Sequence, residues 1–162
     1  MRPVFPAIFR WIPPLLWMAF IFAGSTDLLS ANHTSRFIEP FLRWLFHGSL
    51  STGSIDEIHF LIRKTGHLCE YAVLCILFWW ALIPQKNDHS MPAPRPRWHR
   101  ATVSITLATG FAATDEFHQS FVPTRGASVE DVLIDTVGAA VGLAIFLSVN
   151  RAFRSWKRPR TN

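Results

Sequence analysis

Charged residues are scarce in this chain of 162 residues, because Asp, Glu, Lys and Arg together make up 17% of it. In soluble globular domains these residues make up about a quarter, so the composition argues against an ordinary soluble domain. Cysteine is scarcer still: two residues exclude a disulfide framework and a cysteine-rich zinc fold. No internal repeat is visible, and the length suits one domain over residues 1–162 rather than two independent cores.

Apolar residues are abundant instead, at 49% of the chain, with 7 Trp and 14 Phe. This content excludes disorder, which needs low hydrophobicity and high charge. The net charge of +5 raises the question of nucleic-acid binding. However, the basic residues lie between apolar runs, as orientation signals and lipid contacts do in membrane proteins. We therefore expect a multi-pass membrane protein with the lipid bilayer, and no nucleic acid, as its partner.

Four segments approach the roughly 20 mostly apolar residues that a transmembrane helix needs. They cover about residues 11–27, 66–83, 101–121 and 131–150, and each is slightly short or polar at one end. The expected fold is an all-α membrane protein with a bundle of four transmembrane helices. The first segment also follows basic residues, as a cleavable signal peptide does, and this alternative stays open.

The connection between the first two spans carries apolar residues at helical spacing over residues 37–46. This pattern predicts an amphipathic helix in the membrane interface. Ser54 and Glu57 form a capping-box pattern, which predicts a helix that begins at Ser54 and continues towards the second span. Repeated prolines predict a loop between the second and third spans.

The distribution of Lys and Arg predicts the orientation. The amino end, the proline-rich loop and the carboxyl-terminal tail hold 11 of the 16 basic residues: Arg2, Arg10, Lys86, Arg95, Arg97, Arg100, Arg151, Arg154, Lys157, Arg158 and Arg160. By the positive-inside rule, both termini, including a basic tail over residues 151–162, are expected in the cytoplasm. The amphipathic segment is then extracytoplasmic.

Acidic residues occur at the same height on three of the predicted spans. Glu70, Asp115 and Asp135 each lie about 20–22 Å from the inner end of their helix, counted at 1.5 Å per residue. This depth is about a third of the way into the hydrocarbon core from outside. Charges at such depth cost several kcal/mol unless they pair or face water. We therefore expect the three helices to turn these residues into one pocket that opens outward.

Helical spacing adds further polar residues to this pocket. The predicted lining is Lys64, His67, Glu70, Tyr71, Asp115, Glu116, Gln119, Arg125, Asp131 and Asp135. The acids outnumber the fixed cations, so some carboxylates hold protons or a cation enters. A divalent metal is one such cation, since His-x-x-Glu on one helix and carboxylates on others resemble bundle metal sites. No complete ligand signature is present, so the cofactor stays undetermined.

Several of these residues also have purely structural interpretations. Lys64 could extend to the membrane interface, and Asp131 could cap the fourth helix. Gly138 and Gly142 suit close helix packing. Ser25 could be an ordinary residue at the end of the first span. A polar network that only ties three helices together is therefore a further alternative.

The same residues resemble a known family. The motifs are Lys64-Thr-Gly-His67-x-x-x-Tyr71, Asp115-Glu116-x-x-Gln119, Pro123-Thr-Arg125 and Asp131-x-x-x-Asp135-x-x-Gly138-x-x-x-Gly142. Their order and spacing are similar to those of VanZ-like membrane proteins. The resemblance implies a small multi-span helical protein of the bacterial cytoplasmic membrane, associated with teicoplanin-type glycopeptide resistance.

Two functions follow as hypotheses. In the first, the pocket recognises a lipid or precursor headgroup of the cell envelope, or an amphiphilic glycopeptide antibiotic. In the second, the protein is a membrane-embedded hydrolase or transferase that acts on a lipid-linked substrate. Glu70 or Asp115 would then be the general base and His67 the acid or a ligand. Ion movement ranks last, because the inner halves of the helices are almost wholly apolar.

Overall fold

The computed structural model describes residues 7–26, 31–47, 49–84, 96–122 and 128–157. Within these ranges every regular element is helical and none is a strand, so the all-α class is confirmed. The elements are the 3-10 helix η1 (Ala7–Arg10) and the α-helices α1 (Ile12–Gly24), α2 (Ala31–Leu45), α3 (Thr52–Ala81), α4 (Arg97–Gln119) and α5 (Val129–Trp156).

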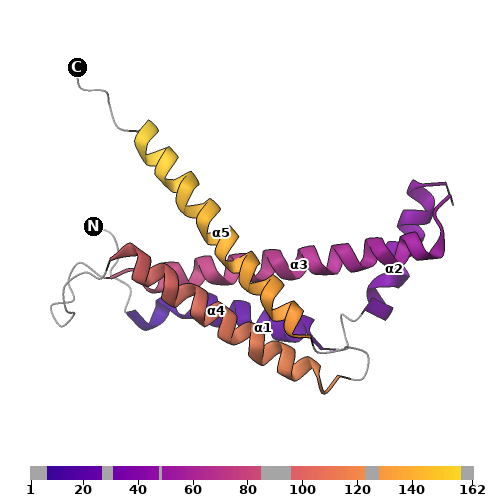
Figure 1. The fold of residues 1–162 in the computed structure, drawn as a ribbon, viewed down its shortest axis with the longest axis horizontal. Helices are drawn as coiled ribbons and strands as arrows, with labels where there is room; N and C mark the ends of the chain where they lie inside the picture. Colours follow the sequence, from indigo (N-terminus) through magenta and orange to yellow (C-terminus); the bar gives the residue numbers. More distant parts are fainter. Residues whose placement is uncertain (1–6, 27–30, 48, 85–95, 123–127, 158–162) are drawn as a thin grey trace.

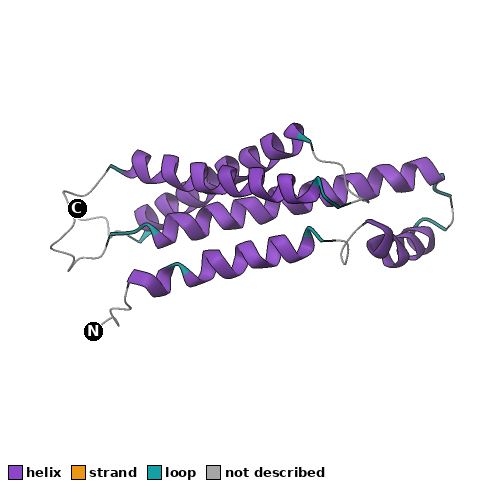
Figure 2. Cartoon of the chain, turned by 90° about the horizontal axis from the view of Figure 1, so that it is seen from below, coloured by secondary structure: helices purple, strands orange, loops and turns teal. Residues whose placement is uncertain are grey.

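Helix α3 is the centre of the fold, since it contacts α1, α2, α4 and α5. Helices α1 and α4 are antiparallel to α3, and α5 is roughly parallel to it (Figures 1 and 2). The end of α1, the end of α4 and the start of α5 therefore meet at one end of the bundle. Most of the ionisable residues of the predicted spans belong to this end of the bundle.

Helix α3 is longer than the predicted second span. Its 30 residues extend about 45 Å at 1.5 Å per residue. Its first half reaches beyond α1, α4 and α5 (Figure 2). The N-cap is Ser51, whose hydroxyl accepts a 3.2 Å hydrogen bond from the backbone N–H of Ser54. The helix thus begins at Thr52, two residues before the Ser54 indicated by the capping-box pattern, because Ser51 is the N-cap.

The other helices also differ from the predicted bounds at their ends. Helix α4 begins at Arg97, directly after Pro96. Helix α5 continues through the basic segment to Trp156, so that part of the predicted tail is helical. Basic residues favour this extension, because a positive charge near a helix C-terminus interacts favourably with the helix dipole. Asp27 and residues 158–162 lie outside the described ranges.

Helix α5 is the one helix in the described part of the chain that is long and apolar enough by itself to cross a membrane. The segment Ile8–Gly24 is apolar but shorter. Helices α3 and α4 are long enough, but their ionisable residues lower their hydropathy. The count of four spans therefore stays a prediction.

Two glycines set the contact between α3 and α5. A Cβ atom on Gly138 would lie 2.6 Å from the backbone oxygen of Leu68, and one on Gly142 would lie still closer to the Cβ of Ala72. Both separations are too short for a real side chain. The close approach predicted from the Gly-x-x-x-Gly spacing is present, and it brings the N-terminal half of α5 against the middle of α3.

Apolar side chains fill the interior of the bundle and also cover its outside. The core includes Leu74, Phe78 and Leu143, from α3 and α5. On the outer face of α5, large apolar residues follow one another at four-residue steps and are about half exposed: Leu133, Val137, Val141, Ile145 and Val149. A soluble monomer rarely exposes so continuous an apolar surface, so this face suits contact with lipid.

Helix α2 lies across α3 rather than along it (Figure 1). It packs onto the projecting half of α3, where Leu42 and Ile55 are both buried. On the opposite face Phe41 and Trp44 are exposed, Trp44 at 73%. The predicted amphipathic segment is thus a helix with one face on the protein and aromatic residues on the other. The side chains of residues 31–37 lie outside the described part.

Candidate functional site

A group of polar side chains is buried between α1, α3, α4 and α5. We call it the polar cluster and define it as Ser25, Glu70, Tyr71, Asp115, Gln119 and Asp135. Asp115 is 2% exposed, Asp135 4% and Tyr71 0%, and Ser25 and Gln119 are also buried. Glu70 alone is partly accessible. The cluster joins the end of α1, the middle of α3, the end of α4 and the first half of α5.

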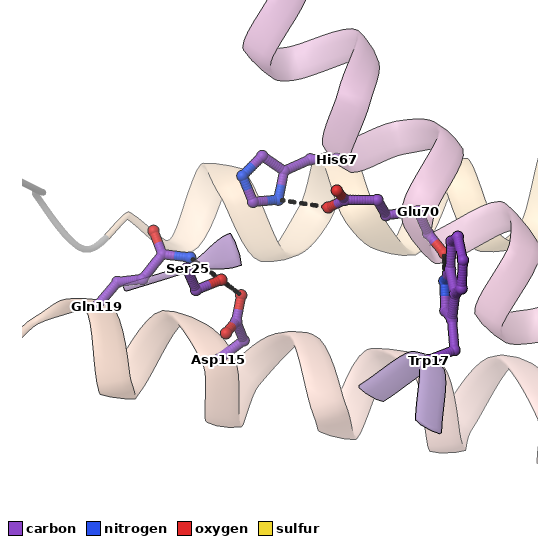
Figure 3. A network of polar contacts seen from close by, with 6 residues as sticks. All are labelled: Trp17, Ser25, His67, Glu70, Asp115 and Gln119. Atoms are coloured by element: carbon purple, nitrogen blue, oxygen red, sulfur yellow. Dashed lines mark hydrogen bonds and ion pairs between the residues drawn. The ribbon is translucent and has the colours of Figure 1, made fainter. Parts of the chain in front are cut away.

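Asp115 is held on one side only. Its Oδ2 atom accepts a 2.7 Å hydrogen bond from the Ser25 hydroxyl and a 3.0 Å hydrogen bond from the Gln119 amide (Figure 3). Gln119 also lies 3.2 Å from the Ser25 oxygen, which closes a triangle of polar contacts. The second oxygen, Oδ1, is buried and has no hydrogen-bond partner within the described residues. A buried acceptor without a donor is costly, so this oxygen is an unsatisfied position of the cluster.

Tyr71 is the residue around which the acids gather. Its hydroxyl is buried and has no hydrogen-bond partner in the described part of the chain. It interacts electrostatically with four carboxylates, those of Glu70, Asp115, Glu116 and Asp135. Asp135 interacts in the same way with the acids of the other two helices. Glu70, Asp115 and Asp135, which come from three helices, thus all lie near enough to Tyr71 to act on the same buried hydroxyl.

His67 and Glu70 form the more accessible part of the site. The distance from His67 Nδ1 to Glu70 Oε2 is 3.9 Å, within reach of an ion pair when the imidazole is protonated (Figure 3). The two residues are one turn apart on α3. The Trp17 indole donates a 2.9 Å hydrogen bond to the backbone oxygen of Glu70, which fixes α1 against this turn.

Lys64 and Asp131 form an ion pair between α3 and α5. Both side chains are partly exposed, at the same end of the bundle as the cluster. Asp131 is therefore not the cap of α5. That position belongs to Ser128, whose hydroxyl accepts a 3.1 Å hydrogen bond from the Glu130 backbone N–H. Within the described residues, Asp131 is the acid with which Lys64 forms its ion pair.

Glu116 is turned away from Asp115. Its Oε1 atom accepts a 2.6 Å hydrogen bond from the Ser128 backbone N–H, so this carboxylate holds the start of α5. His118 lies against Phe22, with ring centroids 4.2 Å apart. Arg125, which the sequence assigns to the pocket, lies outside the described residues, as do Pro123 and Thr124.

The donor set for a metal is incomplete in the part of the chain that the structure describes. No three His, Cys, Asp or Glu side chains there are placed so that they could hold one metal ion. His67 and Glu70 bring two donors, and the hydrogen-bonded Asp115 belongs to a different part of the cluster. The residues described here thus do not fit a divalent metal.

Sequence reasoning missed two residues of the site. Ser25 was interpreted as a possible boundary residue, yet its hydroxyl is one of the two donors to Asp115. A signal was available: Ser25 lies 14 residues, or about 21 Å, after Trp11, the same height as Glu70 on its own helix. Trp17 carries no such signal, because an indole within an apolar helix is usually interpreted as lipid-facing or core.

Comparison with known proteins gives one match. The VanZ/LLP1 family profile matches residues 10–151, which covers most of the chain and includes every residue of the polar cluster. No curated protein and no solved structure gives a significant match. The family match and the apolar α5 together indicate a membrane protein. The chain belongs to the VanZ-like family.

Proposed function

We propose that this protein recognises the polar head of an amphiphile at the outer leaflet of the bacterial cytoplasmic membrane. The candidates are a headgroup of a cell-envelope lipid or precursor and an amphiphilic glycopeptide antibiotic such as teicoplanin. One observation carries the proposal: Asp115 is buried among four helices with one oxygen held by Ser25 and Gln119 and the other unsatisfied within the described residues. A polar group that is retained at such cost is a functional candidate.

The proposal includes a topology. Helices α1, α3, α4 and α5 would cross the membrane, with both termini in the cytoplasm. Their antiparallel order supports this arrangement, since it places the ends of α1 and α4 and the start of α5 together at one end of the bundle (Figure 2). Arg10 supports it at the opposite end, where its guanidinium donates to the backbone oxygen of Ile83 and lies 5.8 Å from the Trp80 ring. Arg and Trp together are typical of a membrane interface.

The entrance to the polar cluster would lie between α2 and the two accessible residues His67 and Glu70. His67 and Glu70 are partly exposed, whereas Asp115 behind them is buried. The aromatic face of α2, with Phe41 and Trp44, would rest in the headgroup region of the outer leaflet. An amphiphile could then keep its chains in the bilayer while its head reaches the cluster.

Catalysis is the second candidate, and one observation favours it. His67 and Glu70 lie 3.9 Å apart at the accessible edge, so a possible acid and a possible base stand within ion-pair distance of each other. Glu70 or Asp115 would act as the general base on a lipid-linked substrate. Asp115→Asn and Glu70→Gln distinguish the two functions: the loss of turnover with binding retained supports catalysis, and the loss of binding supports recognition.

Thiol labelling tests the proposed recognition directly. Cys69 is exposed and directly precedes Glu70, from which it is turned by about 100° around α3, whereas Cys75 is buried. We expect a membrane-impermeant thiol reagent to label Cys69 on intact cells, and teicoplanin or lysophosphatidylethanolamine to slow this labelling. A Cys69→Ser variant gives the background signal from Cys75. Labelling that requires permeabilised cells would contradict the topology.

A cellular test uses the same cluster. We expect Asp115→Asn and Glu70→Gln to change glycopeptide susceptibility or envelope lipid composition. Asp56→Asn is the matched control, because Asp56 is an exposed acid on the projecting half of α3. Unchanged phenotypes at normal protein levels would contradict both functions. Low protein levels in the two cluster variants alone would favour a purely structural network.

A further inference from the structure

We infer that the ligand presents a primary ammonium group to Tyr71, Asp115 and Asp135. This inference rests on the proposed function and names the chemistry that the polar cluster recognises. We call these three residues the ammonium site. They come from three elements, α3, α4 and α5, and all three side chains are more than nine-tenths buried.

Two atoms of the ammonium site lack a partner within the described residues. Asp115 Oδ1 is a buried acceptor, and the Tyr71 oxygen is a second buried acceptor that also carries a proton. Asp115 Oδ2, in contrast, already has two donors. The missing group is therefore one that brings hydrogen-bond donors. An ammonium group has three donors and no acceptor.

The charges of the site favour the same partner. Asp115 and Asp135 interact electrostatically with each other and with Tyr71, so a second negative group would be repelled. In the described part of the chain Lys64 is paired with Asp131, and no Lys or Arg side chain forms an ion pair with Asp115 or Asp135. A buried carboxylate that lacks a counter-charge is strongly unfavourable. A bound cation would supply that charge.

The kind of cation follows from the donors and the rings. A divalent metal needs several ligands in direct contact, and the described residues place no such set together. An ammonium group tolerates longer contacts and gains from aromatic faces. Phe111 packs against Tyr71, with ring centroids 6.2 Å apart, so a second aromatic ring adjoins the site. A quaternary ammonium group lacks N–H donors, so it would leave Asp115 Oδ1 unsatisfied.

Two lipids that differ only at this nitrogen provide the test. Lysophosphatidylethanolamine and lysophosphatidylcholine carry the same chain and phosphate, but the second has no N–H donor. Binding to the purified full-length protein in detergent would be measured from the rise of the unfolding temperature with lipid concentration. We expect lysophosphatidylethanolamine to bind about tenfold or more tightly, the effect of one charge-assisted hydrogen bond. Free ethanolamine, tested in parallel, shows whether the acyl chain is required.

Three variants locate the effect. Asp115→Asn should lose about tenfold or more of the affinity for lysophosphatidylethanolamine, because it removes the negative charge. Tyr71→Phe should lose about threefold to tenfold. It removes a hydroxyl that makes no hydrogen bond in the described structure, so the variant is expected to fold even if Asp115→Asn does not. Asp56→Asn, an exposed acid remote from the cluster, should retain the affinity and the preference between the two lipids.

The outcomes separate this inference from the proposed function. Equal binding of the two lipids, with both lost in Asp115→Asn, would overturn the ammonium inference and leave recognition by the cluster intact. A preference for lysophosphatidylethanolamine that persists in both Asp115→Asn and Tyr71→Phe would also overturn the inference, since the selectivity would then lie elsewhere.

Discussion

The Ser25 hydroxyl donates a 2.7 Å hydrogen bond to Asp115, a residue 90 positions later in the sequence. This contact joins the end of α1 to the end of α4, and both residues are almost fully buried. Because Asp115 Oδ1 has no donor within the described residues, the two donors on Oδ2 are the ones that hold this carboxylate. The contact therefore links the stability of the bundle to the geometry of the polar cluster.

Ser25→Ala should destabilise the protein by about 1.5–3 kcal/mol, the contribution of a hydrogen bond to a charged group. Unfolding in detergent, followed by tryptophan fluorescence, would measure this change. Thr26→Ala is the matched control, since the Thr26 hydroxyl bonds only to the local Ala23 backbone oxygen. Equal effects of the two substitutions would contradict a special role for the Ser25 contact.

Gly142→Ala should destabilise the protein by about 1–3 kcal/mol through overpacking. The new Cβ would overlap the Cβ of Ala72, so α3 and α5 must separate. Gly110→Ala is the control, because no atom lies within 4 Å of a Cβ built there. That control should be neutral or stabilising, since alanine favours a helix over glycine. Denaturation midpoints of the two variants provide the comparison.

Lys64 and Asp131 should show an energetic coupling of about 0.5–1 kcal/mol, because both side chains are partly exposed and solvent screens their attraction. A double-mutant cycle with Lys64→Ala and Asp131→Ala measures this coupling. The exchanged pair, Lys64→Asp with Asp131→Lys, should recover much of the stability that either reversal alone loses. Strictly additive single effects would show that the pair contributes nothing.

Engineered cysteines should report the proposed orientation. In a background with Cys69→Ser and Cys75→Ala, we expect Asp56→Cys to react with an impermeant thiol reagent on intact cells. Ser155→Cys, near the end of α5, should react only after the cells are permeabilised. Both native side chains are exposed, so burial does not limit either reaction. The reverse labelling pattern would place the termini outside and the cluster at the inner leaflet.

Part of this architecture was predictable from the sequence. Apolar segments interrupted by proline-rich or polar stretches indicated an all-α membrane protein, and the structure describes helices in each predicted segment. The heights of Glu70, Asp115 and Asp135 follow from a constant rise per residue. Their faces follow from the helical repeat. Local geometry of this kind is independent of the other helices, which is why it can be predicted without them.

The partners of these residues depended on the tertiary structure. Glu116 bonds to the backbone of Ser128, Lys64 pairs with Asp131, and Ser25, a residue outside the motifs, holds Asp115 together with Gln119. A sequence gives the position of a side chain around its own helix, but not the rotation and crossing of two helices. Here Gly138 and Gly142 fix that crossing, by letting α5 approach the backbone of α3. The sequence determined which residues are costly to bury, and the helix contacts decided which of them meet.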